Sequence, residues 1–383
     1  MKTEFGILAA VCILAGCVRM ETYSTKDRVE LGFDVYSARV NESGTKADDG
    51  TYVPTGTGHL PSGSTFGVFG FFHPEKDGNT GAWADGNRNH PDLMYNQPVN
   101  VSESAGVYSY SYSPKRYWPL SNKETISFFA YYPYDSDGNQ HGIRSTLNSS
   151  SNGMGTFRFT SSENATEQVD FLVSDLCMDQ TKAGGVLTGS APDDAGKVRF
   201  TFHHMLSMVR VQVASISSEN PKISIDEDSY EFAFYGFPIA GNCAPVPGAK
   251  GANGLAPCAF NWSNLLTTVS YRLGDEIIQR ETKMDIDIYE GKADYSDFLL
   301  VIPHEVQDNE RLEITFDLSR DDYKDEGYSF TDNPLFAYLK GKIARFEANK
   351  IYTFNITVSL NEINFEAKVE DWTSGSGDLV FVK

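Results

Sequence analysis

Short runs in which apolar and polar residues alternate recur along most of this chain, and residues that favour turns separate the runs. The first such run, residues 29–40, places its apolar side chains on one face and polar side chains on the other; the apolar residues are Val29, Leu31, Phe33 and Val35. A period of two indicates a β-strand, in which successive side chains point to opposite sides. Residues 29–40 are therefore predicted to form the first strand of the folded body.

Strand signals continue to the end of the chain, and helical periodicity is poorly supported. Val, Ile, Thr, Tyr and Phe recur in runs bounded by Gly, Pro, Asn, Asp and Ser, which is typical of sandwiches and barrels. Further strands are predicted at residues 66–72, 108–113, 126–134, 170–174, 198–202, 208–213, 230–235, 268–273, 284–289, 298–302, 312–318, 350–359, 363–369 and 378–383. The predicted fold class is all-β.

The chain length predicts more than one domain. At 383 residues the chain exceeds what a single hydrophobic core usually serves. Residues 191–196, with the sequence Ala-Pro-Asp-Asp-Ala-Gly, form the best boundary in the middle of the chain. We therefore expect two successive β-sandwich domains, an N-terminal one over residues 18–196 and a C-terminal one over residues 197–383.

The first 17 residues have the layout of a lipoprotein signal peptide. Lys2 supplies a positive charge, and residues 5–16 are apolar but too short to span a bilayer. The segment ends in Leu-Ala-Gly-Cys, in which the thiol of Cys17 would be acylated. The alternative is an ordinary secretory signal with a chance cysteine. Because acyl chains contribute about 0.8 kcal/mol per buried methylene, a multiply acylated Cys17 would hold the chain firmly on a membrane.

The charge balance argues against a nucleic-acid partner. The formal net charge is −20, and the sequence concentrates no basic surface for phosphate contact. Three cysteines follow the signal segment, namely Cys177, Cys243 and Cys258. Cys243 and Cys258 flank a loop rich in Gly, Pro and Ala and could form a disulfide outside the cytoplasm, although their spacing alone does not establish the pairing.

The patterns that resemble catalytic or metal sites are each incomplete. His304 and Glu305 begin like a zinc-protease helix, but Asp308 stands where the second histidine is needed and the preceding residues resemble a strand. His203 and His204 are adjacent on a predicted strand, so their side chains would point to opposite faces. Residues 135–139 imitate the start of a calcium loop but lack its later glycine and glutamate, so a hairpin turn is the better interpretation. No catalytic residue, metal or cofactor is predicted.

Most aromatic residues are explained as fillers of two sandwich cores. Trp83 and Tyr95 lie in loop-like surroundings and are the candidates for contact with a sugar ligand. They define an alternative function, that of a surface-anchored glycan-binding lipoprotein that keeps its first strand and its lipid.

Several stretches in a fixed order carry a family resemblance. They are residues 14–17 (LAGC), 126–134 (ISFFAYYPY), 198–207 (VRFTFHHMLS), 298–303 (FLLVIP), 352–358 (YTFNITV) and 369–372 (VEDW). Together they resemble the fimbrillin family, the lipoprotein-derived subunits of type V pili. The resemblance implies two transthyretin-like Greek-key β-sandwich domains, export as an outer-membrane lipoprotein, and assembly into adhesive surface fimbriae after a trypsin-like protease removes the first strand. The implied partners are other fimbrial subunits and a host or glycan ligand.

Two arginines, Arg28 and Arg39, bracket the first strand, and cleavage after each would have a different consequence. A cut after Arg28 would only free the strand from the lipid, whereas a cut after Arg39 would remove strand and anchor together. The bond after Arg39 is therefore the predicted processing site.

The strand that replaces the first one is expected near the C-terminus. Residues 363–369 and 379–383 have the same alternation, and Gly375-Ser376-Gly377 would let the last piece swing. The candidate donor residues are Ile363, Phe365, Val369, Leu379 and Phe381. The alternative is that both segments are ordinary strands of the second domain.

Overall fold

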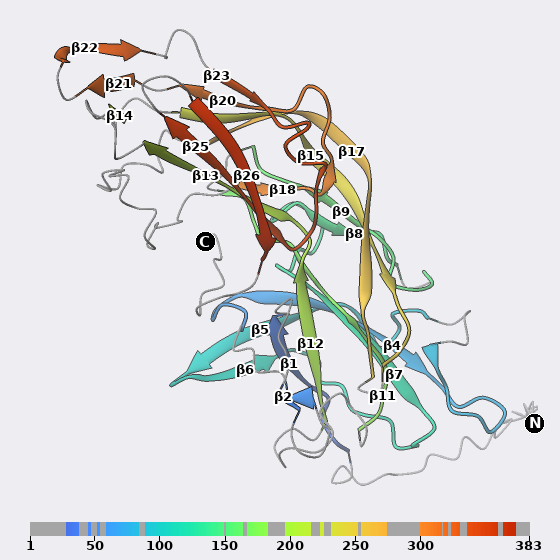
Figure 1. The fold of residues 1–383 in the computed structure, drawn as a ribbon. Coiled ribbons are helices and arrows are strands. Elements are labelled where there is room, and N and C mark those ends of the chain that lie inside the picture. Colours follow the sequence, from blue (N-terminus) through green and yellow to red (C-terminus); the bar gives the residue numbers. More distant parts are fainter. Residues whose placement is uncertain are drawn as a thin grey trace, which may run out of the picture.

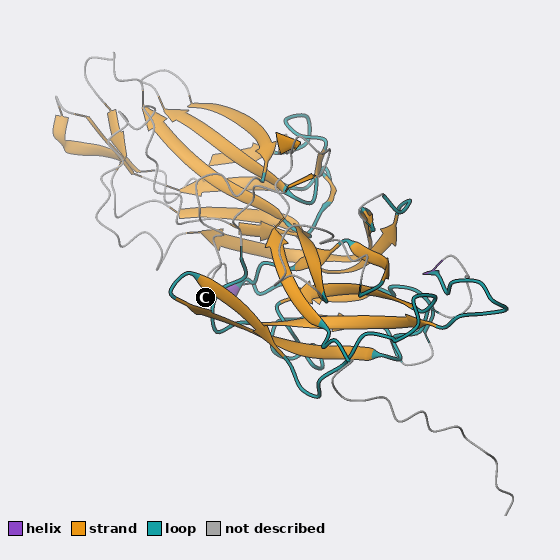
Figure 2. Ribbon diagram, turned by 90° about the horizontal axis from the view of Figure 1, so that it is seen from below, coloured by secondary structure: helices purple, strands orange, loops and turns teal. Residues whose placement is uncertain are grey.

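The computed structural model describes residues 28–37, 45–46, 52–53, 59–83, 89–148, 151–163, 167–182, 196–215, 223–225, 231–251, 254–273, 299–315, 317–320, 323–329, 335–358 and 363–372. All of the named elements in these residues are β-strands, so the fold is all-β, as the sequence predicts (Figure 1 and Figure 2). Among the same residues there is no helix with the length and apolar character that a membrane crossing needs.

A nine-stranded sheet contains most of the first half of the chain. Its strands lie in the order β1 (Gly32–Ser37), β12 (Lys197–His204), β10 (Leu172–Ser174), β7 (Thr125–Tyr132), β4 (Thr65–His73), β5 (Met94–Ser104) and β6 (Val107–Ser111). A side branch adds β11 (Leu176–Gln180), which pairs with β7 and with β16 (Leu255–Ala256). The first and last strands of the described path are thus β1 and β6.

Both faces of this sheet are buried around its central strands. Phe128 of β7 packs with the first strand in one core cluster, and its neighbour Phe129 packs in another cluster on the opposite face. Strands buried on both faces need no polar alternation, which explains the unbroken apolar runs of β4 and β7.

Two further sheets contain most of the second half. One has the order β18 (Leu299–Val301), β13 (Ser207–Ser215), β25 (Lys350–Val358) and β26 (Ile363–Asp371). The other has the order β23 (Leu335–Tyr338), β20 (Arg311–Thr315), β15 (Glu231–Pro247), β9 (Phe157–Thr160) and β8 (Ile143–Ser145), with β17 (Cys258–Leu273) paired to β15. Short ladders join β14 (Ile223–Ile225), β21 (Asp317–Arg320) and β22 (Tyr323–Ser329), β19 (His304–Glu305) with β24 (Arg345–Phe346), and β2 (Thr45–Lys46) with β3 (Tyr52–Val53).

The long hairpin of β15 and β17 connects the two halves (Figure 1). One part of β15 pairs with β20, where Phe232 lies opposite Ile314. Further along, Ala240 lies opposite Thr160 of β9, a strand from the first half of the sequence. The hairpin therefore takes part in the packing of both halves.

The sheets do not change at residue 196, where the composition suggests a boundary. β12 follows that position but belongs to the nine-stranded sheet, whereas β8 and β9 precede it and join the sheet of the second half. The chain passes from the nine-stranded sheet to the four-stranded one between β12 and β13. Gly and Asp at residues 193–196 indicate a loop, but only the pairing partners decide to which sheet the next strand belongs. The predicted strands at residues 284–289 and 378–383 lie outside the described residues.

Candidate functional site

The first strand lies at the end of the nine-stranded sheet and pairs in parallel with β12 (Figure 1). The register runs from Gly32 opposite Lys197 to Ser37 opposite Phe202. On its other side β12 is paired to β10. Loss of β1 would therefore expose one edge of β12 and leave the rest of the ladder in place.

The inward side chains of this strand are buried. Leu31 is 0%, Phe33 3% and Val35 1% exposed, and Val29 is partly buried against the same cluster. Gly32 and Asp34, which alternate with them, are only partly covered. The alternation in the sequence thus corresponds to an alternation of burial in the structure.

Phe33 is surrounded by aromatic rings from two strands of the sheet and from the segment that follows β6. Its ring stacks on Phe200 of β12, with centroids 5.5 Å apart and an interplanar angle of 26°. It also contacts Tyr112 at 5.4 Å and Phe128 of β7 at 6.0 Å. Tilted and offset ring pairs of this kind add to the stabilisation from burial.

A loop segment binds the backbone at the start of the strand. The amide of Leu31 donates to the carbonyl of Arg116 at 2.9 Å, and the amide of Trp118 donates to the carbonyl of Val29 at 3.0 Å. The Tyr112 hydroxyl donates to the carbonyl of Leu31 at 2.6 Å. Burial raises the pKa of Tyr112 to about 12, so the hydroxyl keeps the proton that this bond needs.

Gly196 lies immediately before β12 and bonds to two parts of the site. Its carbonyl accepts from the amide of Gly32 at 3.0 Å and from the indole of Trp118 at 2.8 Å. The backbone has a φ of 85°, and a Cβ atom built there would lie 2.7 Å from Cγ1 of Val29. Only glycine tolerates both conditions. The sequence predicts no contact of Tyr112, Trp118 or Gly196 with the first strand. Tyr112 lies in a predicted strand and the other two in loop-like stretches, and spacing does not show which distant segment each would meet.

Two ion pairs flank the strand on its polar side. Asp34 lies 3.5 Å from Arg199 of β12, with both side chains less than one fifth exposed. Glu30 lies 2.5 Å from Lys115 at the surface. The exposed pair contributes little to stability, because solvent screens it.

Among the predicted processing residues, the structure describes only Arg28. It is exposed immediately before the first strand. Cys17 and Arg39 lie outside the described residues.

The first of the two C-terminal segments is a strand of the body. β26 pairs in antiparallel register with β25 from Ile363 opposite Val358 to Asp371 opposite Lys350. Phe365 stacks on Phe354 at 5.3 Å, whereas Val369 is 46% exposed. Leu379 and Phe381 lie outside the described residues.

Trp372 fixes the point that follows β26. It is 5% exposed, and its ring stacks on the imidazole of His204 with centroids 3.7 Å apart and an angle of 7°. His204 Nδ1 lies 2.7 Å from the buried carboxylate of Asp170. Its neighbour His203 lies 3.0 Å from Asp175 and packs against Phe260. The two histidines thus point into different surroundings, as the sequence predicts.

The disulfide that the sequence suggested between Cys243 and Cys258 is not formed, and all three described cysteines are free. Cys243 lies opposite Trp262 and Cys258 opposite Pro247, so the two are separated by four residues along β17. Four strand residues span about 13 Å, which is beyond the reach of a disulfide. Burial also raises the pKa of Cys258 to about 12, so its thiol stays protonated.

The residues considered for metal binding are paired within the core. His304 Nε2 lies 3.0 Å from Glu310, which is completely buried, and His304 Nδ1 lies 2.6 Å from the carbonyl of Ile302. The Asp135 carboxylate accepts from backbone amides of the turn that follows it, including those of Gly138 and His141. Across the described part of the chain, no group of three or more His, Cys, Asp or Glu is arranged to hold a metal ion.

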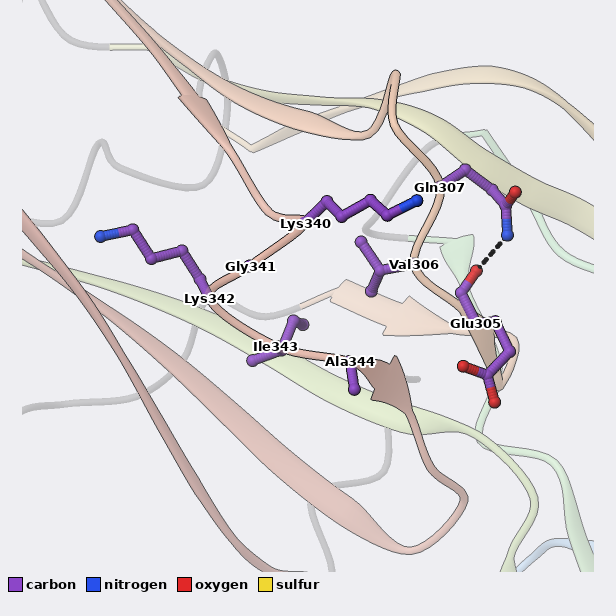
Figure 3. Close-up of a pocket in the computed structure, with 8 residues that line it drawn as sticks. All are labelled: Glu305, Val306, Gln307, Lys340, Gly341, Lys342, Ile343 and Ala344. Atoms are coloured by element: carbon purple, nitrogen blue, oxygen red, sulfur yellow. Dashed lines mark hydrogen bonds between the residues drawn. The ribbon is translucent and has the colours of Figure 1, made fainter.

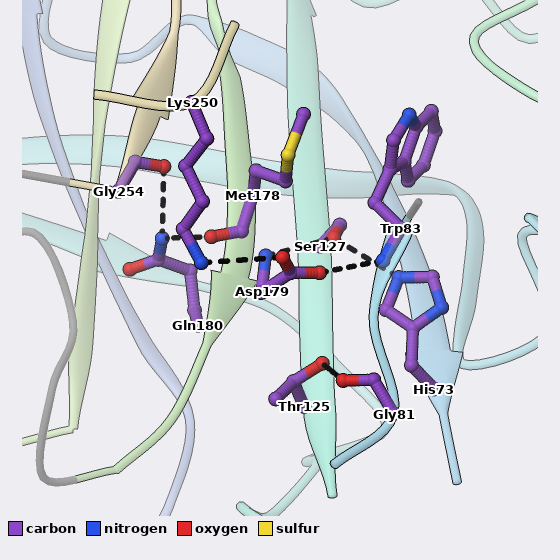
Figure 4. Close-up of polar contacts among 10 residues, drawn as sticks. All are labelled: His73, Gly81, Trp83, Thr125, Ser127, Met178, Asp179, Gln180, Lys250 and Gly254. Atoms are coloured by element: carbon purple, nitrogen blue, oxygen red, sulfur yellow. Dashed lines mark hydrogen bonds and ion pairs between the residues drawn. The ribbon is translucent and has the colours of Figure 1, made fainter. Parts of the chain in front are cut away.

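Trp83, a candidate for sugar contact, packs against the core. Its ring lies edge-on to Phe71 at 5.1 Å and to His73 at 6.0 Å. Its amide donates to Asp179 at 2.7 Å, and Asp179 also pairs with Lys250 at 3.2 Å (Figure 4). Trp83 therefore has a packing role. Tyr95 is 51% exposed, but its hydroxyl donates to the carbonyl of Leu147 at 2.6 Å.

A pocket lies between β19, β24 and the turn after β23 (Figure 3). Lys340 and Lys342 point in opposite directions there, and their amines do not converge. Lys340 pairs with Asp308 at 2.5 Å, and Lys342 donates to the carbonyl of Phe365 in β26 at 3.2 Å. The pocket thus lacks the converging polar groups that a catalytic site needs.

Comparisons with solved structures find relatives of low identity. A fimbrial protein from Bacteroides vulgatus ATCC 8482 is 17% identical, with 91% of this chain and 100% of that chain covered and a TM-score of 0.49. A cell-adhesion candidate from Bacteroides uniformis ATCC 8492 is 15% identical, with 92% and 100% covered and a TM-score of 0.48. The tip fimbrial protein Mfa3 from Porphyromonas gingivalis, with a C-terminal truncation, is 10% identical, with 81% and 95% covered and a TM-score of 0.34.

A search of curated proteins found no match. The profile of a family described as fimbrillin-like matches residues 45–372, which is most of the chain. The protein belongs to the fimbrillin-like family.

Proposed function

We propose that this chain is a structural, non-enzymatic subunit of adhesive surface fimbriae that joins its neighbours by strand exchange. It would be exported as a lipoprotein with its acyl chains on Cys17 in the outer membrane, and would then lose its first strand to a protease. Membership of a fimbrillin-like family supports the fimbrial subunit role and a cell-surface location. Other fimbrial subunits would be its main partners, with a host or glycan ligand in addition. Each subunit would have the two Greek-key sandwiches that the family resemblance implies.

The burial of β1 carries the strand-exchange part of this proposal. Leu31, Phe33 and Val35 are almost completely buried. Residues Gly32–Ser37 pair with β12, and only the start of the strand is also bonded to residues 116–118. At about 1.5 to 3 kcal/mol per buried side chain, filling the vacated groove would contribute roughly 5 to 9 kcal/mol before ordering costs. An unpaired edge beside an empty apolar groove favours the addition of a strand from another molecule.

We place the cut after Arg39 because that position removes the whole strand. A cut after the exposed Arg28 would leave Leu31, Phe33 and Val35 in their groove. Such a cut would release the protein from its lipid without opening a binding site.

We assign donation to the residues that follow Trp372, with Leu379 and Phe381 as the side chains that enter the groove. β26 is less suited to leave, because it is paired to β25 along its length and Trp372 is buried at its end. Ile363, Phe365 and Val369 would accordingly stay with the subunit that carries them.

Limited proteolysis tests the proposal. Purified protein starting at residue 18 would be treated with trypsin, imaged by electron microscopy and sequenced from the N-terminus. We expect filaments whose subunits begin at Val40. Arg39→Ala should abolish them, and the matched Arg28→Ala variant should form them normally. Filaments made of uncut purified subunits would contradict strand removal. So would filaments from cells whose subunits all begin at Cys17.

A further inference from the structure

Three neighbouring strands have one face on the core and the other face directed away from it, at the end of the molecule remote from β1 (Figure 1). They are β15, β20 and β23, which pair in this order. Phe234 and Leu312 belong to the buried core cluster that these strands form with β13, β18 and β25, and Leu335 packs against that cluster. The residues that alternate with these therefore lie on the opposite face.

Aromatic and charged residues occupy this outer face in register. Arg311 lies opposite Tyr235 on one side and opposite Tyr338 on the other, so the three form a row across the strands. In the next row Phe336 lies opposite Glu313. We name Tyr235, Arg311, Glu313, Phe336 and Tyr338 the aromatic platform.

The guanidinium of Arg311 is held between rings. Its Cζ lies 4.5 Å from the centroid of Tyr235 and 5.3 Å from that of Phe336. Arg311 Nη2 lies 4.0 Å from a carboxylate oxygen of Glu313, and the two side chains are 30% and 21% exposed. A planar donor and a carboxylate acceptor are thus fixed side by side with part of each facing solvent.

The platform is small and open. Phe336 is 51% and Tyr338 57% exposed, and they lie two residues apart on one strand. Half-exposed rings of this size offer on the order of 200 Å² together. A stable protein interface needs about 800 Å² from each partner, so this patch suits a ligand with one or two ring-sized faces better than a folded protein.

The charges narrow the ligand class. Arg311 and Glu313 balance each other, and the whole chain carries a formal charge of −20. The negative charge of the chain would repel a polyanion. At the platform itself such a ligand would meet a single cation, Arg311, which is already paired with Glu313. An uncharged molecule with one apolar ring face and several hydroxyl groups matches both the rings and the donor and acceptor pair.

We propose that the aromatic platform binds a neutral carbohydrate. The rings of Phe336 and Tyr338 stack on the C–H faces of sugar rings, while Arg311 donates to hydroxyl oxygens and Glu313 accepts from hydroxyl groups. This site differs from the one at Trp83 and Tyr95 that the sequence suggested. It is also independent of strand exchange, since it lies on a sheet that β1 does not join.

Affinity electrophoresis tests this site. The chain from residue 18 would be run in native gels that contain soluble glucan, mannan or galactan, with heparin as the anionic comparison. We expect at least one neutral polysaccharide to retard the protein, and Phe336→Ser combined with Tyr338→Ser to weaken this binding by about tenfold or more. Leu266→Ser is the matched control, because Leu266 is 64% exposed on β17 outside the platform. Arg311→Lys, which keeps the charge but loses the planar fork, should also weaken binding.

Three outcomes would overturn the proposal. In the first, none of the three neutral polysaccharides retards the protein. In the second, the platform variants and Leu266→Ser reduce the retardation equally. In the third, heparin alone retards the protein. Sedimentation of the same proteins checks the other class of partner. Self-association that the double variant abolishes, without any retardation, would make the platform a protein contact instead. Unchanged thermal unfolding of each variant confirms that it is folded.

Discussion

Phe33 is the side chain that joins the first strand most closely to the rest of its sheet. Its ring contacts rings of Phe200, Tyr112 and Phe128, which come from β12, the segment before residue 116 and β7. Surrounding side chains relax only partially when a buried ring is removed. Truncation at this position would therefore leave a cavity.

Phe33→Ala should lower the free energy of unfolding of the uncleaved chain by about 3 to 5 kcal/mol. Urea unfolding followed by tryptophan fluorescence would measure the change. Val107→Ala is the control, because Val107 is 69% exposed on β6 and should change stability by less than about 0.5 kcal/mol. Equal effects of the two substitutions would show that β1 does not contribute to the core.

Tyr112→Phe should weaken the loss of stability that the protein shows at alkaline pH, because the substitution removes a group that loses its proton more readily in the unfolded state. Burial raises the pKa of Tyr112 from its usual 10.0 to about 12 in the folded state. The folded form therefore holds this proton more tightly, and its contribution to stability is complete below pH 10 and is lost as the pH rises toward 12. Urea midpoints between pH 8 and 12 should fall less steeply in Tyr112→Phe. An unchanged slope would contradict this assignment.

At the scale of elements, alternation predicts strands well where one face is buried and one is wet. β1 and β12 are both found from the period of two, and both alternate in burial. β23 was missed although Phe336 and Tyr338 alternate with Leu335 and Ala337, because the run has only four residues. The pairing partners of the strands could not be predicted from the sequence. The Gly- and Asp-rich composition at residues 193–196 does not show that β12 belongs to the nine-stranded sheet.

The candidate site was predicted in part. The inward residues of the first strand follow from their spacing. Tyr112, Trp118 and Gly196 are distant in the sequence, and only the fold brings them to the strand. The possible disulfide between Cys243 and Cys258 is not formed for a related reason, because spacing along the chain does not give the pairing register of β15 and β17, which places Cys243 opposite Trp262.

A peptide should replace the first strand from outside. Chain that starts at Val40 would be mixed with a synthetic peptide of residues 28–39 and its thermal unfolding measured. We expect a rise in Tm that grows with peptide concentration, because the peptide binds only the folded state. A peptide with Phe33→Ala should give little rise. If neither or both peptides raise Tm, the groove does not recognise the strand through its inward side chains.

At the scale of the whole molecule, the groove and the proposed donor belong to different parts of one chain. β1 pairs with β12 in the nine-stranded sheet, while β26 and Trp372 end the described chain on another sheet. Trp372 itself packs on His204 at the far end of β12, beyond the residues that pair with β1. The proposal of exchange therefore requires that the segment after Trp372 leaves its own subunit and enters the groove of a second one.

Deletion of residues 374–383 should block filament formation by trypsin-treated protein but leave folding intact. Electron microscopy would score filaments, and thermal unfolding would show that the remaining chain is folded. A chain with Leu379→Ala and Phe381→Ala is the matched variant of full length, and it should assemble poorly for the same reason. Normal filaments from either protein would place the donor elsewhere.

The parallel pairing of β1 with β12 sets a direction for any filament built in this way. An incoming strand that keeps the same hydrogen bonds can enter the groove in one orientation only, because the bonding pattern of an antiparallel strand would not match. Every joint would then have the same sense. Such a fibre has two unlike ends, one offering an empty groove and the other a free tail, and it lengthens by head-to-tail addition.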